Sequence, residues 1–271
     1  MSKSVGYAAS IIRARARRAD ARCPYCGCTR PVKVGYKHML LTLFECPGCG
    51  LKYRFPKDDP ATAVEFYEHD YRERSVTDVP GADDIRIFAA RGFAGSAFDR
   101  RDKVAFLANW VKYDAAVLDY GASFGYMLHQ MRETGFSRLT GFEVSKWRAE
   151  IARSRLGLRV FDSLQELEPQ GYDCIYASHV LEHLPDLATI FPLFRSLLRP
   201  SGLLCVWTPN ASREALQPFG GGWAHLVGEP HTVAIDYDFL GRALRDNGFE
   251  IRYMGPRQEF ELCVVAQAVP E

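Results

Sequence analysis

The chain lacks any long apolar run, and this absence limits the cellular locations that we expect for the protein. No stretch of its 271 residues approaches the roughly 18 to 20 apolar residues that cross a bilayer. The first residues also lack the apolar block of a secretion signal. The hydrophobic content of 47% is ordinary for a globular chain that buries a sizeable core. We therefore expect an intracellular, cytoplasmic protein.

A strong net charge is also missing, because the formal net charge at pH 7 is only +1. The charges are unevenly spread, since residues 1–60 carry 12 Lys and Arg against 4 Asp and Glu, and the remainder carries 22 against 29. Residues 1–22 contain a single acid, Asp20, and are expected to form a basic arm. Such an arm either binds a polyanion or is a solvated basic face. An organelle transit peptide has a similar composition, but a helical or flexible arm is the more ordinary interpretation.

Four cysteines form two C-x-x-C pairs, in the sequences CPYCG and CPGCG. Two such pairs at this separation allow four thiolates to converge in a tetrahedron, which is typical of a structural zinc site. The stretch VKVGYKHMLLTLFE between them indicates a strand, a turn and a strand, as in a zinc ribbon. Iron could take the place of zinc, and Cys28 is given no ligand role. The expected ligands are Cys23, Cys26, Cys46 and Cys49.

Four thiolates leave no open position for a substrate, so this metal should be structural. A module of about 40 residues buries too little core to fold alone, and metal binding should supply much of its folding free energy. We expect metal removal to unfold roughly the first 50 residues while the rest of the protein stays folded.

The dinucleotide-binding pattern G-x-G-x-x-G is absent as well, although a related turn is present. In VLDYGASFG, Val117–Gly125, a short apolar strand ends in a glycine turn before the helical run YMLHQMRETG. The turn reads D-x-G-x-S-x-G, and an acid at the strand end would repel a pyrophosphate. It suits a cationic ligand, such as S-adenosylmethionine (SAM) with its ammonium and sulfonium groups. The expected contacts are Asp119, Gly121, Ser123 and Gly125.

A second acid follows the next predicted strand, Arg138–Phe142, at Glu143. Nucleoside-binding α/β folds place a carboxylate at this point to accept the ribose hydroxyls. Acids at two neighbouring strand ends strengthen the prediction of a nucleoside pocket.

With these residues in view, the segment Val117–Asn210 resembles a class I SAM-dependent methyltransferase. VLDYGASFG, LTGFEVS, FDSLQEL, YDCIYASHVLEHLPD and LLRPSGLLCVWTPN match the family's motifs in order. Ser123 departs from the glycine that the family commonly has. The resemblance implies an α/β fold with a seven-stranded, mostly parallel Rossmann-like sheet and helices on both faces. It also implies contacts to the adenine from Val144 and Asp162, and to the methionine end from Ser178.

The stretch ASHVLEHLPD carries candidate chemistry for removing a proton from the acceptor. Neutral histidine suits this task, and His183 is one candidate base, with a capping role as its alternative. His231 is the second candidate, in a region where His225 and Glu229 also occur and where GGG beside Trp223 suggests a mobile cover. The pair of Glu182 and His183 is similar to the metal-binding pair of some methyltransferases, although no further acid could be placed beside it.

The expected domains are a basic arm at 1–22, a zinc ribbon at 23–55, a helical connector at 56–112 and a methyltransferase domain at 113–271. Zinc-ribbon methyltransferases of polysaccharide and natural-product gene clusters look similar, with an aromatic lid at the positions of Tyr67 and Tyr71. The resemblance favours a small-molecule or sugar acceptor, methylated on a hydroxyl. Two alternatives stay open: an RNA methyltransferase that grips phosphates with its ribbon and arm, and a scaffold protein whose catalytic domain no longer acts.

Overall fold

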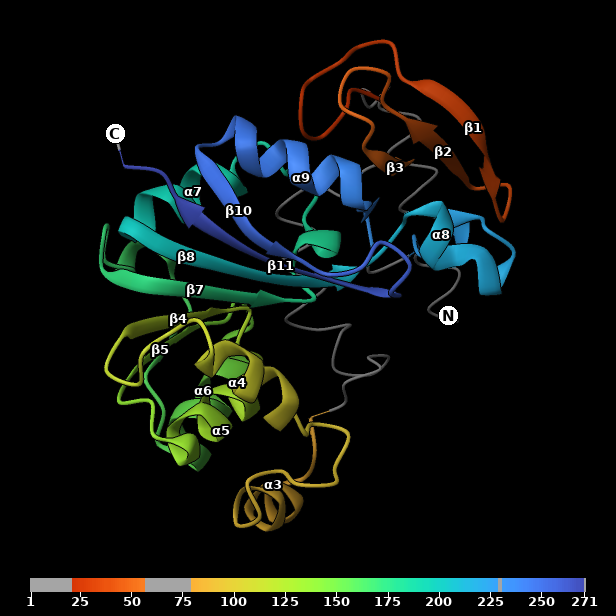
Figure 1. Ribbon diagram of the computed structural model, residues 1–271. Coiled ribbons are helices and arrows are strands. Elements are labelled where there is room, and N and C mark those ends of the chain that lie inside the picture. The colour runs from red at the N-terminus through yellow and green to blue at the C-terminus, as the bar shows by residue number, and fades with distance from the viewer. Residues whose placement is uncertain (1–20, 57–78, 229–230, 271) are drawn as a thin grey trace. The chain divides into compact units, whose positions relative to one another are not determined.

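The computed structural model describes residues 21–56, 79–228 and 231–270. The chain divides into two compact units, which are described separately below (Figure 1). The first unit contains Met1–Pro60, His179–Pro192 and Trp207–Val264, and the second contains Ala61–Ser178, Leu193–Val206 and Val265–Glu271. The basic arm up to residue 20, the lid residues Tyr67 and Tyr71, and Glu229 lie outside the described residues. Among the helices that are described, none has the length and apolar character needed to cross a membrane.

The main sheet has seven strands in the order β10-β11-β8-β7-β4-β5-β6. Strand β4 pairs in parallel with both β5 and β7, and β5 pairs in parallel with β6. This topology confirms the predicted α/β class with a seven-stranded, mostly parallel sheet. The strands are β4 Ala116–Tyr120, β5 Arg138–Phe142, β6 Val160–Phe161, β7 Tyr172–Ser178, β8 Leu198–Pro209, β10 Phe249–Met254 and β11 Glu261–Ala268.

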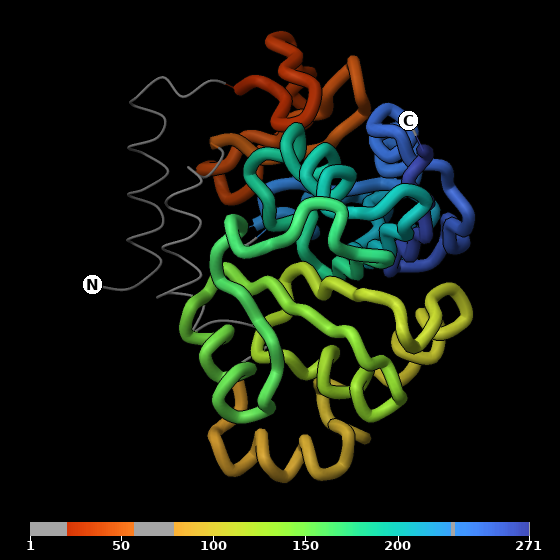
Figure 2. The backbone as a smooth tube through the Cα atoms, turned by 90° about the vertical axis from the view of Figure 1, so that its left-hand side faces the viewer, coloured from red at the N-terminus to blue at the C-terminus, as the bar shows by residue number. Residues whose placement is uncertain are grey.

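Helices link the parallel strands of the second unit, and Figure 2 traces these connections along the backbone. All five residues of β4 are buried, which explains its unbroken apolar character. Helix α5 ends at Gly135, which takes the left-handed conformation that favours glycine at a helix end. The helical segments that are described here are α3 Ala82–Ala89, α4 Arg101–Ala108, α5 Tyr126–Thr134, α6 Lys146–Leu156 and the 3-10 turn Leu164–Glu166, and α7 Ile190–Leu197 has residues in both units.

Two helices lie within the range 56–112, where a helical connector is predicted. Residues 82–89 form helix α3. The ring of Phe88 packs against Phe93 and Phe98 at centroid distances of 6.4 Å, so tertiary contacts favour this helix over the local turn signals. Helix α4 follows and begins at Arg101. The Asp99 carboxylate accepts hydrogen bonds from the backbone amides of Gly95 and Arg101, which fixes the turn before α4.

The first unit contains a second sheet, of four strands in the order β1-β2-β3-β9. The pairs β1–β2, β2–β3 and β3–β9 are all antiparallel. The predicted strand, turn and strand between the cysteine pairs is therefore confirmed as β1 and β2. The strands are β1 Val32–Lys37, β2 Leu41–Glu45, β3 Lys52–Phe55 and β9 Val233–Ala234, and the helical segments are Leu181–His183, α8 Arg213–Leu216, Gln217–Phe219, Trp223–His225 and α9 Tyr237–Asp246.

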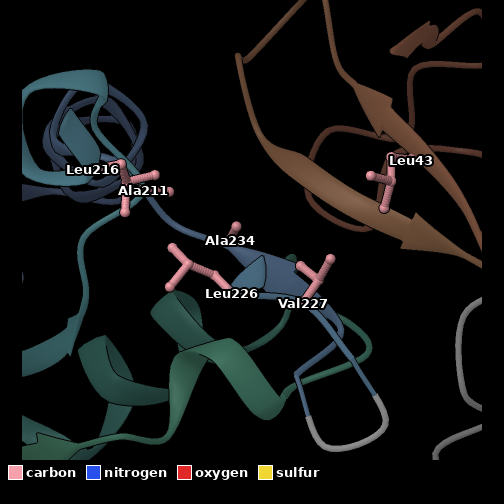
Figure 3. Close-up of a cluster of buried hydrophobic side chains, with 6 residues drawn as sticks. All are labelled: Leu43, Ala211, Leu216, Leu226, Val227 and Ala234. Carbon is pink, nitrogen blue, oxygen red and sulfur yellow. The ribbon is translucent and has the colours of Figure 1, made fainter. Parts of the chain in front are cut away.

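The cysteine-bearing segment of this unit is not a separate module. Strand β9, which comes about 180 residues after β3, completes its sheet through the pairs Lys52↔Ala234 and Tyr53↔Val233. A buried apolar cluster also joins β2 to distant segments, as Figure 3 shows. Its members are Leu43, Ala211, Leu216, Leu226, Val227 and Ala234.

The first cysteine pair is held by further long-range contacts. The carbonyl of Pro24 accepts hydrogen bonds from the amides of Leu187 and Ala188 at 3.0 and 3.2 Å. The ring of Tyr25 meets Phe239 edge-on at 5.1 Å. The expectation that the ribbon unfolds alone therefore needs revision, because its sheet and core include residues from the rest of the unit.

Candidate functional site

The predicted glycine turn after β4 has the backbone conformation that its sequence indicates. Gly121, Ser123 and Gly125 have φ angles of 90°, 50° and 85°, all in the left-handed region. A Cβ on Gly125 would lie 2.6 Å from Leu158 Cδ1. Glycine is therefore required here both for its torsion and for close packing. Helix α5 begins directly after this turn, so the turn and the first amides of the helix present backbone to a ligand.

The carboxylate of Glu143, directly after β5, holds this turn in place. Its Oε2 accepts a hydrogen bond from the amide of Ser123 at 2.8 Å, and its Oε1 accepts one from the amide of Ser145 at 2.9 Å. The carboxylate thereby links the turn after β4 to the start of helix α6. Arg148 donates to the Ser123 hydroxyl at 2.8 Å, which fixes the one residue that departs from the family pattern.

The neighbouring carboxylate of Asp119 has a different environment. Its register partner on β5 is Gly141, two residues before Glu143, and it is only 3% exposed. Its Oδ2 has no hydrogen-bond partner among the described residues. Burial, and secondarily the charge of Glu143, raises the pKa of Asp119 to about 8. A buried and unpartnered carboxylate oxygen is costly, and a cationic ligand would compensate it.

The remaining predicted cofactor contacts lie at the ends of the neighbouring strands. Val144 is half-buried directly after Glu143. Asp162, after β6, accepts a hydrogen bond from Arg153 at 3.1 Å. Ser178 ends β7, and its hydroxyl accepts a hydrogen bond from Lys103 at 3.3 Å. Sequence reasoning missed Lys103, which is only 9% exposed, because nothing in the sequence of helix α4 distinguishes it from a surface lysine.

The four predicted metal ligands come together in the first unit. Their sulfur atoms all lie within 4.8 Å of one another, with Cys23 to Cys49 at 3.5 Å and Cys26 to Cys46 at 3.4 Å. Sulfur atoms around one tetrahedral zinc ion lie about 3.8 Å apart, given a Zn–S bond of about 2.3 Å. The cluster therefore has the size of a tetrahedral thiolate site.

The backbone around these cysteines also fits such a site. Gly27 and Gly50, which follow the two pairs, have φ angles of 71° and 75° as the turns require. A hydrogen bond from Cys49 lowers the pKa of Cys23 to about 5, so this thiol ionises readily. The same pairing raises the pKa of Cys49. Cys28 is not among the four converging residues.

Three side chains of the histidine-rich stretches form a second cluster in the first unit. The potential ligand atoms of Glu182, His183 and His231 lie within 4.8 Å of one another. The rings of His183 and His231 meet edge-on at 4.6 Å. Sequence reasoning treated the two histidines as alternative bases, and the structure brings them together with a carboxylate. Their separation along the chain hid this from the sequence.

The carboxylate of Glu182 is 2% exposed and has partners on both oxygens. Oε1 accepts a hydrogen bond from His179 Nδ1 at 3.0 Å, and Oε2 accepts one from the Thr208 hydroxyl at 3.0 Å. Burial opposes its ionisation, but the hydrogen bond from His179 and the nearby imidazoles of His183 and His179 outweigh burial and lower the pKa of Glu182. Glu182 is therefore a buried anion.

The other nitrogen of His179 contacts Glu261 Oε1 at 2.7 Å. Because carboxylates accept hydrogen bonds, both nitrogens of His179 donate, and the imidazolium form provides both protons. The backbone of His179 has a φ angle of 54°, which is uncommon for a residue other than glycine. Sequence reasoning did not foresee the contact of His179 with Glu182.

His231 and His225 differ in their surroundings. His231 Nδ1 contacts the carbonyl of Leu226 at 2.8 Å, so Nδ1 donates and Nε2 of a neutral ring keeps its lone pair. His225, expected in the same cluster, instead packs against Phe219 at 5.8 Å. Trp223, expected in a mobile cover, packs against the apolar cluster of Figure 3.

The strand order, the glycine turn after β4 and the acid after β5 define a class I SAM-dependent methyltransferase. A family model described as a methyltransferase domain matches residues 92–253, which is more than half of the chain. The chain belongs to this methyltransferase family.

Similar proteins support this class. Trans-aconitate 2-methyltransferase of Methylobacterium radiotolerans is 33% identical over 117 residues, which cover 40% of this chain and 44% of that protein. A ubiquinone biosynthesis O-methyltransferase of Neisseria meningitidis is 30% identical over 132 residues, which cover 45% of this chain and 50% of that protein. The matches thus span half the length of these relatives or less.

Among solved structures, magnesium protoporphyrin IX methyltransferase of Synechocystis, determined with bound SAH, shares the fold with a TM-score of 0.54. It is 19% identical, and the match covers 77% of this chain and 99% of that one. At this identity the likeness concerns the fold alone.

Proposed function

We propose that this methyltransferase transfers the methyl group of SAM to a hydroxyl of a small-molecule or sugar acceptor. The single observation that carries the cofactor assignment is the unpartnered, buried Oδ2 of Asp119 beside a left-handed glycine turn. A dinucleotide would bring a pyrophosphate to this point, and the acid would repel it. A ligand with a positive charge near its nucleoside compensates the carboxylate.

In this proposal, different pocket residues contact different parts of SAM. Asp119 would face the positively charged methionine end, and the turn residues Gly121, Ser123 and Gly125 would let the ligand approach the backbone. Glu143 would accept the ribose hydroxyls, while Val144 and Asp162 would contact the adenine. Ser178 and Lys103 would bind the methionine carboxylate, since an ammonium next to a hydroxyl suits an anion. When bound, SAM supplies an activated methyl group for direct displacement by the acceptor.

The chain's own contribution to the chemistry is alignment and proton removal. A hydroxyl acceptor loses its proton as the methyl group arrives, and a neutral imidazole accepts protons near pH 7. His183 and His231 are the two candidate bases. The hydrogen bond from His231 Nδ1 to the Leu226 carbonyl supports His231, because it leaves Nε2 as the basic nitrogen.

We also propose that Cys23, Cys26, Cys46 and Cys49 hold a structural zinc ion in a ribbon. The convergence of four sulfur atoms supports this assignment. None of the eight cysteines forms a disulfide bond, and a location in the reducing cytoplasm is part of this proposal. The domain boundaries at residues 22, 55 and 112 stay a proposal, with the arm and connector on either side of the ribbon.

The acceptor class rests on the resemblance to enzymes of polysaccharide and natural-product clusters. The test is transfer of labelled methyl from SAM to two acceptor sets, hydroxylated small molecules including sugar nucleotides, and structured RNA, at several salt concentrations. Turnover of a small acceptor that hardly responds to salt supports the proposal. Methylation of RNA that weakens steeply with salt would replace it with the RNA alternative. SAM binding without transfer to either set would favour the scaffold alternative.

A further inference from the structure

The cluster of Glu182, His183 and His231 has the composition and size of a metal site. Three atoms that lie within 4.8 Å of one another share a point that is within about 2.8 Å of each, whereas metal–nitrogen and metal–oxygen bonds are about 2.0 to 2.2 Å long. Side-chain shifts of well under 1 Å would therefore bring all three atoms to one ion. The three residues belong to the same compact unit.

Other groups orient these side chains as the outer partners of a metal site do. The Leu226 carbonyl accepts a hydrogen bond from Nδ1 of His231, so Nε2 of the neutral ring keeps its lone pair for a metal. Metal-binding histidines commonly make this hydrogen bond with their other nitrogen. Glu182 is fixed by His179 and Thr208, and the amide of Thr232, next to His231, donates to the Glu182 carbonyl at 2.9 Å. The two segments that carry the cluster are thus tied together.

We propose that Glu182, His183 and His231 bind a divalent transition-metal ion, distinct from the ion of the cysteine cluster. Two imidazoles and one carboxylate suit ions such as Mn²⁺, Fe²⁺ or Zn²⁺, whereas four thiolates favour zinc. Three protein ligands leave open positions on the ion, in contrast to the closed thiolate site. If the proposed function holds, an oxygen-bearing acceptor would bind at these positions, and the ion rather than a free imidazole would promote loss of its proton. The metal binding itself does not depend on that function.

The experiment measures binding of Mn²⁺ to the full chain by electron paramagnetic resonance. The protein is first dialysed until one zinc ion per chain remains, so that the thiols are occupied. We expect one Mn²⁺ per chain in the unaltered protein. The variant His231→Gln should weaken Mn²⁺ binding by more than about 100-fold, because it removes a ligand, and Thr208→Val by about 10-fold, because it frees the carboxylate.

The matched control is His225→Gln, which makes the same change a few residues away. His225 is not part of the cluster and should keep the affinity of the unaltered protein. Circular dichroism shows whether each variant is folded, and Thr208→Ser, which restores the hydroxyl, should recover the affinity that Thr208→Val loses.

Two results would overturn the proposal. Equal Mn²⁺ affinity in the unaltered protein and in folded His231→Gln would mean that the ion binds elsewhere. No binding of Mn²⁺ or Co²⁺ by the folded, unaltered protein would mean that the cluster is a hydrogen-bonded proton relay. Calorimetry with SAM separates these outcomes from failure of the proposed function, since it reports the cofactor pocket alone.

Discussion

The glycine turn and the cysteine cluster differ in how far apart along the chain their hydrogen-bonding partners lie. Around the glycine turn, the Glu143 carboxylate binds amides that lie 20 and 2 residues away along the chain. Around the cysteine cluster, Tyr25 accepts a hydrogen bond from Asn247, 222 residues away. The first region needs two strands and the turns that follow them, whereas the second needs most of its unit to be folded.

The two compact units also differ in how they hold a buried carboxylate, Glu182 in the first unit and Asp119 in the second. Glu182 is 2% exposed, has partners on both oxygens and has a lowered pKa. Asp119 is 3% exposed, has an unpartnered oxygen and has a pKa raised to about 8. The protein itself compensates the first charge, whereas we propose that a cationic ligand compensates the second.

The largest effect should come from removing the metal of the cysteine cluster. Because the ribbon shares a sheet and a core with later segments, residues 179–192 and 207–264 should lose amide protection together with residues 21–56. Structural zinc contributes about 10 kcal/mol or more to small domains, so the loss should be extensive. Hydrogen exchange of chelated protein, or of Cys46→Ser, measures it. Loss of protection confined to residues 21–56 would restore the idea of a separate ribbon.

A smaller but still large effect is expected for Glu143→Gln. The new amide group would point a donor at the amide of Ser123 or Ser145, which are donors themselves. We expect SAM affinity to fall by about 100-fold or more, and the free energy of unfolding to fall by about 1–3 kcal/mol. Calorimetry and urea unfolding measure the two. Glu150→Gln, an exposed change on α6, serves as the control.

A third experiment uses pH to test the uncompensated charge of Asp119. A cationic ligand requires ionised Asp119, so SAM affinity should rise with pH up to about 8, by at most about tenfold per pH unit, and then level off. In Asp119→Asn this rise should disappear and binding should be weak throughout. Calorimetry in buffers of different ionisation enthalpy should detect a proton released on binding. A pH-independent affinity with no released proton would show that Asp119 is already charged.

The same group affects stability without ligand. Its pKa in the folded protein is about 8, well above the ordinary value of an aspartate, so the folded state holds an extra proton between these values. The free energy of unfolding should therefore fall as pH rises from about 4 through 8. Asp119→Asn should lack this component of the decline, whereas Asp114→Asn, at an exposed position, should behave like the unaltered protein. Urea unfolding across this pH range measures the difference.

The smallest effect concerns the adenine end of the pocket. Asp162→Ala should weaken binding of S-adenosylhomocysteine by about three- to tenfold, the value of one exposed hydrogen bond. An inosine analogue, which lacks the amino group, should bind both proteins alike. Arg153→Ala removes the partner of Asp162 but keeps the acceptor, and should leave the affinity unchanged. Equal loss for both ligands would remove Asp162 from adenine recognition.

The contrast between the regions also explains what could be predicted from sequence. The turn at Gly121–Gly125 and the acid at Glu143 belong to one local strand, turn and helix pattern, and the structure contains these elements where the sequence predicts them. The seven-stranded sheet was predicted from the resemblance to the methyltransferase family that these motifs carry. The bounds of helix α3 could not be predicted from the sequence, because the helix is stabilised by contacts with other segments. These are the aromatic packing of Phe88 and the contact of His129 with the Ala89 carbonyl.

The histidine and glutamate cluster could be seen only in part. Glu182 and His183 are adjacent, so their pairing could be predicted. His231 lies 48 residues further on, just before β9, and its place in the cluster could not. His179 and Thr208 were missed as partners of Glu182 because hydrogen bonds between strand ends leave no periodic signal in the sequence.

The pairing of β3 with β9 has a consequence for how such a gene can change. An amino-terminal ribbon whose sheet contained only its own strands could be exchanged between genes by a single recombination near residue 56. Here the fourth strand of its sheet, Val233–Ala234, is encoded far downstream, just ahead of α9. A ribbon exchanged in this way would lack the β9 strand that matches it, so the two coding segments are constrained to diverge together.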